Sequence, residues 1–164
     1  MTTSIRRLLP EDRAPLAAFP DRVSAETART RFHGPMKLLT APTLDLLLNL
    51  EPGCREALVA VDDRGLAAVA RFARDACGDP SSDTAEVAII VADDRQRGGL
   101  GRDLMARLAV LAGEAGIRSF RATVQEDNDG ARSFVASLDR GTVGRFVGNT
   151  VVFVLDVDAV AGRC

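Results

Sequence analysis

Residues 91–102 read Val91-Ala-Asp-Asp-Arg-Gln96-Arg97-Gly98-Gly99-Leu100-Gly101-Arg102. A mostly apolar run of strand length, residues 85–92, leads into this glycine-rich turn, and the leucines that follow recur at helical spacing. A strand, a tight turn and a helix in this order direct free backbone N–H groups and the positive end of the helix at one point. Glycine also lets the backbone come close to a phosphate. The segment therefore predicts an anion site, although a plain strand-to-helix connection could use the same residues.

Two familiar phosphate loops do not fit the turn. No Gly-Lys-Ser/Thr follows it, so it is not a Walker loop. The dinucleotide-binding pattern requires Gly or Ala at the position of Leu104, which excludes that loop as well. Arginine is enriched here, because Arg95, Arg97 and Arg102 lie within eight residues of one another. We expect their side chains to add charge-assisted contacts to a bound phosphate.

Helix and strand signals elsewhere predict an α+β fold in a single domain over residues 1–164. Five helices are expected. The first starts near Pro10, the second runs from Ser24 to Arg31, and the third starts at Thr40 or Thr43. The fourth runs from Leu100 to Gly113 or Gly116, and the fifth spans 128–138. The expected strands are 4–9, a hairpin of 57–61 and 66–72, 85–92 after a loop at 73–84, 120–124, and a second hairpin of 142–147 and 150–157.

Composition excludes several classes of protein. A net charge of −2 and a pI near 5.5 argue against a nucleic-acid binder, and no apolar run is long enough for a membrane span or a signal peptide. Three cysteines, Cys54, Cys77 and Cys164, are odd in number and lack CxxC spacing, which predicts reduced thiols in the cytoplasm and no metal site. Lys37 is the single lysine beside 20 arginines, a bias typical of a high-GC bacterium.

The segment Gln96-Arg-Gly-Gly99-Leu-Gly101 resembles the Q/R-x-x-G-x-G/A motif of the GNAT acetyltransferase superfamily, which lies between a central strand and a long helix. The next strand, 119–124, leads to Asn128 much as in that family's V-x-x-x-N segment. Element order agrees over nearly the whole chain. The resemblance implies the GNAT fold, a mixed and mostly antiparallel sheet flanked by helices, and an acetyl-CoA-dependent N-acetyltransferase.

Four further segments are similar to the GNAT domains of bacterial Pat-type protein lysine acetyltransferases: 31–36, 56–60, 69–72 and 85–88. This resemblance implies a protein lysine as the amine acceptor. Two other readings stay open, namely a GNAT enzyme for a small-molecule amine and a catalytically weak acyl-CoA-binding regulatory module.

The resemblance also implies where acetyl-CoA binds. Its pantetheine arm would pair with the strand around Ile89 and Val91, and a backbone N–H near Val91 would polarise the thioester carbonyl. Its pyrophosphate would take amides from the turn, and Asn128 would both cap a helix and contact the cofactor. The expected cofactor-binding residues are Ile89, Val91, Gln96, Arg97, Gly98, Gly99, Gly101, Arg102 and Asn128.

Glu86 is the candidate general base. A lysine amine, with a pKa of about 10.4, must lose a proton before it can attack a thioester. Glu86 is a lone acid in an apolar strand, and we expect desolvation to raise its pKa towards the useful range. The glutamate at this place is the base in the Pat-like enzymes. The alternative is a glutamate near a strand start that is solvated or paired with an arginine.

No side chain is expected to act as the general acid. Many GNAT enzymes use a tyrosine about seven residues after the asparagine, but the chain has none, and Val135 and Phe134 occupy this place. Ser133, Asn128, a water or unaided release of the thiolate are the remaining options. The single histidine, His33, lies in a turn signal and is not expected to be catalytic.

Two apolar segments have more than one interpretation. Leu44, Leu47 and Leu48 fit a core face, and could instead line the acceptor groove that early helices form in this superfamily. The strand 150–155, if it lay at an exposed sheet edge, could pair with a second subunit in a homodimer.

Overall fold

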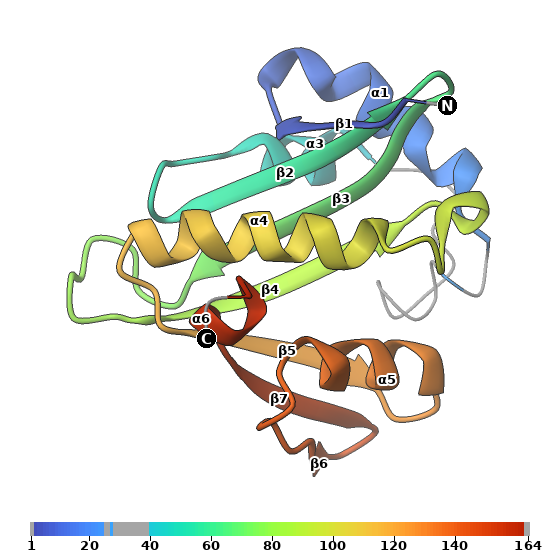
Figure 1. Ribbon diagram of the computed structural model, residues 1–164. Coiled ribbons are helices and arrows are strands. Elements are labelled where there is room, and N and C mark those ends of the chain that lie inside the picture. Colours follow the sequence, from blue (N-terminus) through green and yellow to red (C-terminus); the bar gives the residue numbers. More distant parts are fainter. Residues whose placement is uncertain (1, 25–26, 28–39, 163–164) are drawn as a thin grey trace.

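The computed structural model describes residues 2–24, 27 and 40–162. One seven-stranded sheet has the order β1-β2-β3-β4-β5-β7-β6, in which only β4 and β5 run parallel (Figure 1). The strands are β1 (Ser4–Arg7), β2 (Arg55–Asp62), β3 (Gly65–Arg74), β4 (Thr84–Val91), β5 (Ser119–Gln125), β6 (Arg145–Val147) and β7 (Thr150–Asp156). The expected mixed, mostly antiparallel sheet of an α+β domain is confirmed.

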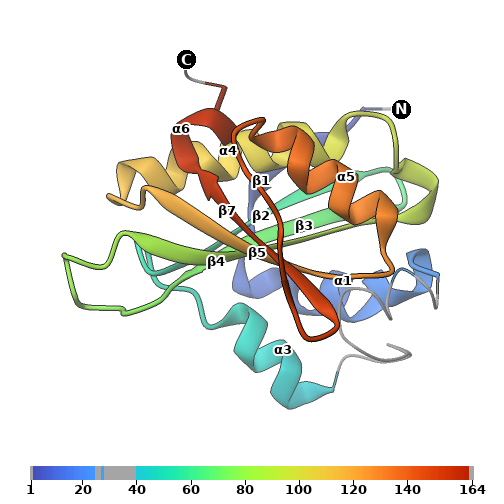
Figure 2. The same ribbon diagram turned by 90° about the horizontal axis from the view of Figure 1, so that it is seen from below.

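Helices cover both faces of the sheet (Figure 2). One face carries α1 (Arg13–Ala18) and α3 (Ala41–Leu48), and the other carries α4 (Leu100–Glu114), α5 (Asp129–Leu138) and α6 (Val157–Val160). Short 3-10 turns complete the described elements: η1 (Pro10–Asp12), η2 (Phe19–Arg22) and η3 (Asp93–Arg95).

Capping side chains set two of the predicted helix starts. Thr40 Oγ1 accepts a hydrogen bond from the Thr43 N–H, which makes Thr40 the N-cap of α3. Asn128 Oδ1 does the same for α5 by accepting from the Ala131 N–H at 3.0 Å. The predicted helix from Ser24 to Arg31 lies largely outside the described residues, as do His33 and the Pat-like segment 31–36.

The main core lies between the sheet and α4. The leucine stripe of this helix is confirmed, since Leu104 and Leu108 are fully buried and Leu100 and Leu111 pack at the margin. Alanines of β3, among them Ala68 and Ala70, lie beneath the helix and are also fully buried. Their small side chains let α4 come close to the sheet, so the position of its N-terminus is fixed by packing.

The second core lies beneath α1 and α3. Leu44 is buried there, and Leu47 and Leu48 pack against it, so the core interpretation of these leucines is confirmed. Leu46 points away and is exposed.

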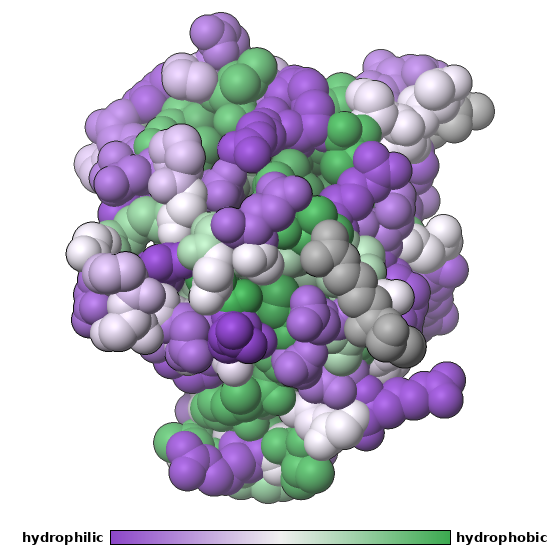
Figure 3. Space-filling view, turned by 60° about the vertical axis from the view of Figure 1, so that its left-hand side comes forward, coloured by the Kyte–Doolittle hydropathy of each residue, from purple (hydrophilic) through white to green (hydrophobic). Residues whose placement is uncertain are grey.

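The strand that could have formed a dimer edge lies inside the sheet. β7 pairs with β5 along its whole length, but with β6 only at residues 150–152, so no described strand lies beside residues 153–156 on that side. β6 is an edge strand of the sheet, and its residues Phe146 and Val147 are exposed to solvent. Figure 3 shows apolar residues gathered at the lower end of the molecule, the end that holds β6 and β7 in Figure 1. The edge condition for pairing through residues 150–155 is therefore met only by residues 153–155, and a homodimer stays a prediction.

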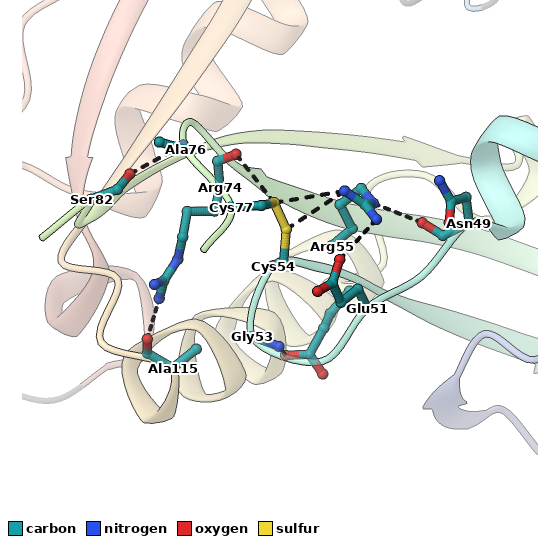
Figure 4. The surroundings of a disulfide bond; sticks show 11 residues. Asn49, Glu51, Gly53, Cys54, Arg55, Arg74, Ala76, Cys77, Ser82 and Ala115 are labelled. Carbon is teal, nitrogen blue, oxygen red and sulfur yellow. Dashed lines mark hydrogen bonds and ion pairs between the residues drawn. A yellow bond between two sulfur atoms is a disulfide. The ribbon is translucent and has the colours of Figure 1, made fainter. Parts of the chain in front are cut away.

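The prediction of three reduced thiols is wrong for two of them, because Cys54 and Cys77 form a disulfide (Figure 4). Cys54 precedes β2 and Cys77 follows β3, and the antiparallel pairing of these strands brings the two Cα atoms to 5.4 Å. The bridge spans 23 residues of sequence, a separation without any recognisable spacing motif. Only the hairpin register shows that the two cysteines meet.

We predict that replacing both bridged cysteines, Cys54→Ser with Cys77→Ser, lowers the free energy of unfolding by about 3 kcal/mol, because the open chain regains loop entropy in the unfolded state. Urea denaturation measures the loss. The matched control is Cys164→Ser, which leaves the bridge intact and should unfold at the wild-type urea concentration. Three titratable thiols in unreduced, denatured wild-type protein would contradict the disulfide itself.

Candidate functional site

The parallel strands β4 and β5 are paired only at one end. Their pairing covers Thr84–Glu86 and Ser119–Arg121, after which the carboxyl ends of the strands diverge (Figure 1). Each strand keeps its other partner, because β4 pairs with β3 and β5 with β7 along their lengths. A cleft of about 790 Å³ lies between the diverging strands, and the glycine turn and the first turns of α4 and α5 line it.

The cleft exposes backbone groups of β4. The Ala92 N–H donates to the Ala67 carbonyl at 2.8 Å, which sets the phase of the antiparallel ladder with β3. In such a ladder alternate residues bond to the partner strand, so Ile90 turns its N–H and C=O towards β3. Ile89 and Val91 turn theirs the other way, into the cleft. The Val91 carbonyl is occupied there by Gln96 Nε2 at 3.1 Å, which ties the turn to the end of the strand.

The glycine turn requires left-handed backbone at two positions. Gly99, the N-cap of α4, has φ +84°, and Arg97 has φ +63°. Gly101 is needed for a different reason, since a Cβ there would lie 3.3 Å from the Phe134 ring and 3.5 Å from Val91. No side chain caps α4, so the N–H groups of its first turn remain available to a ligand in the cleft.

The three arginines of the turn have different roles. Arg97 is exposed on the lining of the cleft and makes no ion pair with any residue in the described part of the chain. Arg102 also lines the cleft, but its guanidinium donates to the Ser137 hydroxyl at 2.7 Å and carbonyl at 3.2 Å, joining α4 to α5. Arg95 bonds to Asp62 and Thr3. Arg95 and Arg102 therefore already have hydrogen-bond partners within the protein, and the contact of Arg97 with a phosphate stays a prediction.

Asp62, at the end of β2, anchors the turn from behind. Its side chain is fully buried, and its carboxylate accepts hydrogen bonds from Arg22 at 2.9 Å and from Arg95 at 2.8 Å. Arg22, whose side chain is 9% exposed, also bonds to Asp94 at 3.0 Å. The hydrogen bond from Arg22 holds the pKa of Asp62 below its usual value, and burial acts in the opposite direction. Buried charge thus joins the β2–β3 hairpin to the start of the turn.

The structure brings most of the predicted cofactor residues to one place. Eight of them line the cleft: Ile89, Val91, Gln96, Arg97, Gly99, Gly101, Arg102 and Asn128. Gly98 lies in the turn and is not among the lining residues. Where the family's tyrosine is expected, Val135 is buried and Phe134 lines the cleft, so neither position offers a proton. Ser133 is exposed and is not among the lining residues either.

Glu86 lies beside the cleft, at the last paired position of β4. Its side chain is 61% exposed, so the expected burial in an apolar strand is wrong. The cause is strand alternation: Val87 faces the core under α4, whereas Glu86 points to the opposite face, near the margin of the α1–α3 core. Its Oε2 lies 3.8 Å from Nη2 of Arg121 on β5.

Sequence reasoning missed Arg121 and its partner Asp75. Arg121 is the one charged residue of β5, just as Glu86 is that of β4, and this pattern in neighbouring strands was the available signal. Asp75 lies in the loop after β3 and gave no signal in the sequence. In residues 2–24, 27 and 40–162, no three His, Cys, Asp or Glu side chains form a group that could hold a metal ion. None of the helices described is long and apolar enough to cross a membrane.

Comparison with known proteins gives a family. The sequence profile of the Acetyltransferase (GNAT) family matches residues 23–139. The crystal structure of the GNAT domain of S. lividans PAT superposes with a TM-score of 0.85 at 28% identity, over 95% of this chain and 91% of that one. No curated protein sequence matches the chain.

Two other solved structures add to this comparison. A cAMP-binding acyltransferase from Mycobacterium smegmatis is 29% identical with a TM-score of 0.64, and the match covers 94% of this chain but 43% of that longer one. The structure of yncA from Salmonella typhimurium with its cofactor acetyl-CoA has a TM-score of 0.73 over 96% of this chain and 95% of that one. Its 20% identity shows a shared fold alone.

We predict that Asp62→Asn destabilises the protein by about 3–5 kcal/mol, because Arg22 would stay buried without its carboxylate. Urea denaturation at pH 7 measures the loss. Asp103→Asn removes an exposed carboxylate that pairs with Arg107, and as the control it should cost at most about 0.5 kcal/mol. Similar losses in the two variants would show that the buried network does not hold the turn.

The same network predicts an acid limit to stability. The pKa of Asp62 is lowered in the folded state, so its contribution is present above the unfolded pKa of about 3.9 and is lost as the pH falls through the lower folded value. Urea titrations between about pH 5 and about pH 2.5 cover this range. The free energy of unfolding should fall less over this range in Asp62→Asn than in the wild type. Parallel curves for the two proteins would contradict the assignment.

Proposed function

The chain belongs to the acetyltransferase (GNAT) family, and from this membership we propose that it transfers the acetyl group of acetyl-CoA to the ε-amine of a protein lysine, with Glu86 as the general base. GNAT acetyltransferases depend on acetyl-CoA as the donor, and the cleft is the place where this chain would bind it. The observation that carries the proposal is the opening of β4 from β5 directly above a glycine turn with uncapped helix amides.

The residues of the cleft fit the chemistry of the donor. Ile89 offers a backbone N–H and C=O in the geometry of a sheet edge, which suits the amide groups of a pantetheine arm. The first-turn amides of α4 and the Arg97 guanidinium offer hydrogen bonds and positive charge to a pyrophosphate. Gly101 lets the Phe134 ring lie close to the turn, because a Cβ at this position would be 3.3 Å from the ring.

The choice of a protein lysine as the acceptor is supported by likeness to the Pat group. The GNAT domain of S. lividans PAT matches at 28% identity over nearly all of both chains. The segment 85–88, which holds Glu86, is one of the four that resemble the Pat-type enzymes. An amine acceptor of low molecular weight is the alternative within the same reaction class.

Glu86 performs the step that the acceptor requires. Acetyl transfer forms a C–N bond and breaks the thioester C–S bond, and the lysine ammonium must first give up a proton. The exposed Glu86 carboxylate takes that proton directly or through a water. The thiolate leaves without a side-chain acid, because Phe134 and Val135 at the place of the family's tyrosine carry no proton to donate.

A catalytically weak acyl-CoA-binding module is the second candidate. The absence of tyrosine from the whole chain favours it, as does the exposure of Glu86. Turnover separates the two candidates, since a binding module would take up acetyl-CoA and transfer nothing. A cytoplasmic location stays a prediction, and the disulfide removes the cysteine argument that supported it.

We expect acetyl-CoA to stabilise the folded protein by about 2.7 kcal/mol at 100 times its dissociation constant. A thermal-shift series with acetyl-CoA, CoA and longer acyl-CoAs measures this effect and ranks the acyl groups. Arg97→Gln should weaken binding by about three- to tenfold, because an exposed cation–phosphate contact is lost. Arg107→Gln, also on the surface of α4, should bind as the wild type does. No shift with any of the ligands would withdraw the assignment of the cleft.

We predict that Glu86→Gln lowers kcat by about 10²- to 10⁴-fold without changing the affinity for acetyl-CoA, because the variant keeps its shape but cannot accept a proton. Chromatographic measurement of CoA release with lysine-containing peptides gives kcat, and calorimetry gives the affinity. Glu114→Gln at the exposed end of α4 is the matched control. Unchanged turnover in Glu86→Gln would remove Glu86 from the reaction.

A further inference from the structure

Three charged side chains lie in a row beside the end of the β4–β5 pairing. The Arg121 guanidinium donates two parallel hydrogen bonds to the Asp75 carboxylate, from Nη1 to Oδ2 at 2.8 Å and from Nη2 to Oδ1 at 2.9 Å. The same Nη2 lies 3.8 Å from Oε2 of Glu86, beyond hydrogen-bond distance. Arg121 is thus fully paired with Asp75 and only a neighbour of Glu86.

Asp75 is held in place by the structure around it. Its own N–H donates to the Thr84 carbonyl at 3.0 Å, at the start of the strand that carries Glu86. The preceding residue, Arg74, donates its N–H to the Cys54 carbonyl at 2.8 Å. The disulfide joins Cys54 to Cys77, which lies two residues after Asp75 (Figure 4). The Asp75 carboxylate therefore meets Arg121 from a restrained loop. The hydrogen bonds from Arg121 also hold the pKa of Asp75 below its usual value, so the pair stays charged at neutral pH.

This arrangement affects what Glu86 can do as a base. An arginine that paired fully with Glu86 would occupy both carboxylate oxygens and make the group a poorer proton acceptor. The other cation that acts on Glu86 is Arg71 of β3, whose own pKa is lowered chiefly by burial. Arg71 and Arg121 thus both interact electrostatically with Glu86, and Asp75 faces Glu86 only through its pairing with Arg121.

We propose that Arg121 is a positioning residue for Glu86 and that Asp75 sets its position. Asp75 accepts hydrogen bonds from both Nη1 and Nη2 of Arg121. This pairing orients the guanidinium beside Glu86 and leaves the Glu86 carboxylate oxygens free to accept a proton. The proposal rests on the function assigned to Glu86 above.

The test compares the pH dependence of kcat/KM in three variants. In Asp75→Asn, Arg121 is released to pair with Glu86, so the midpoint of the acid limb should fall by about half to one pH unit and the plateau should fall by about three- to tenfold. In Arg121→Gln the midpoint should rise by a similar amount. The double variant should regain activity relative to Asp75→Asn, because the competing cation is gone.

Asp83→Asn is the matched control, since Asp83 lies in the same loop and its carboxylate contacts Thr84 and not Arg121. It should keep the wild-type profile. The proposal is overturned if Asp75→Asn leaves the midpoint in place, or if the double variant is no more active than Asp75→Asn. A merely structural pair would lower stability and activity in all three variants without moving the midpoint in opposite directions.

A second measurement does not depend on turnover. Carbon-13 NMR of the glutamate carboxyls, with the Glu86 signal assigned by its loss in Glu86→Gln, follows the titration of Glu86 directly. The midpoint should move down in Asp75→Asn and up in Arg121→Gln. Movements of this kind in a protein that binds acetyl-CoA but transfers nothing would overturn the proposed acetyl transfer and leave the relation of Arg121 to Glu86 standing. If the enzyme is active but the Glu86 midpoint is the same in all variants, the proposed acetyl transfer stands and the relation of Arg121 to Glu86 is overturned.

Discussion

The pairing of β4 with β5 ends at Glu86 and Arg121, and the site depends on that limit. Beyond it, each strand is held by its antiparallel neighbour, so the two can diverge without losing their places in the sheet. Divergence leaves β4 with backbone groups that have no strand opposite them. It also opens the space into which the glycine turn, the first turn of α4 and the ring of Phe134 project.

Two sets of interactions keep the opening in shape. On the inner side, Arg102 bonds to Ser137 and Gly101 leaves room for the Phe134 ring, which joins α4 to α5. On the outer side, the buried Asp62 holds Arg22 and Arg95, which fixes the turn to the β2–β3 hairpin. Arginines that a sequence reader would assign to phosphate binding are therefore largely used for structure. All three arginines line the cleft, but Arg97 is the one that makes no ion pair or side-chain hydrogen bond with a described residue.

The candidate base lies where the paired and unpaired parts of β4 meet. Strand alternation turns Glu86 away from the core under α4, and the parallel register places Arg121 opposite it. Asp75, restrained near the disulfide, competes for that arginine. In our proposal Asp75 acts on Glu86 through Arg121, which lies 46 residues away from Asp75 in the chain, so the role of Asp75 could not be found from the strand alone.

Local sequence determined much of this protein. The glycine turn, the leucine stripe of α4, the caps Thr40 and Asn128 and the alternation in β4 are short-range patterns, because turns, helix caps and periodicity depend on neighbouring residues. The tertiary structure decided what depends on register and burial. It joined Cys54 to Cys77, placed β7 inside the sheet, committed Arg95 and Arg102 to structural partners and left Glu86 exposed beside Arg121. Each of these outcomes needs two segments far apart in the chain to meet, and only the packing of the sheet and its helices specifies where they do.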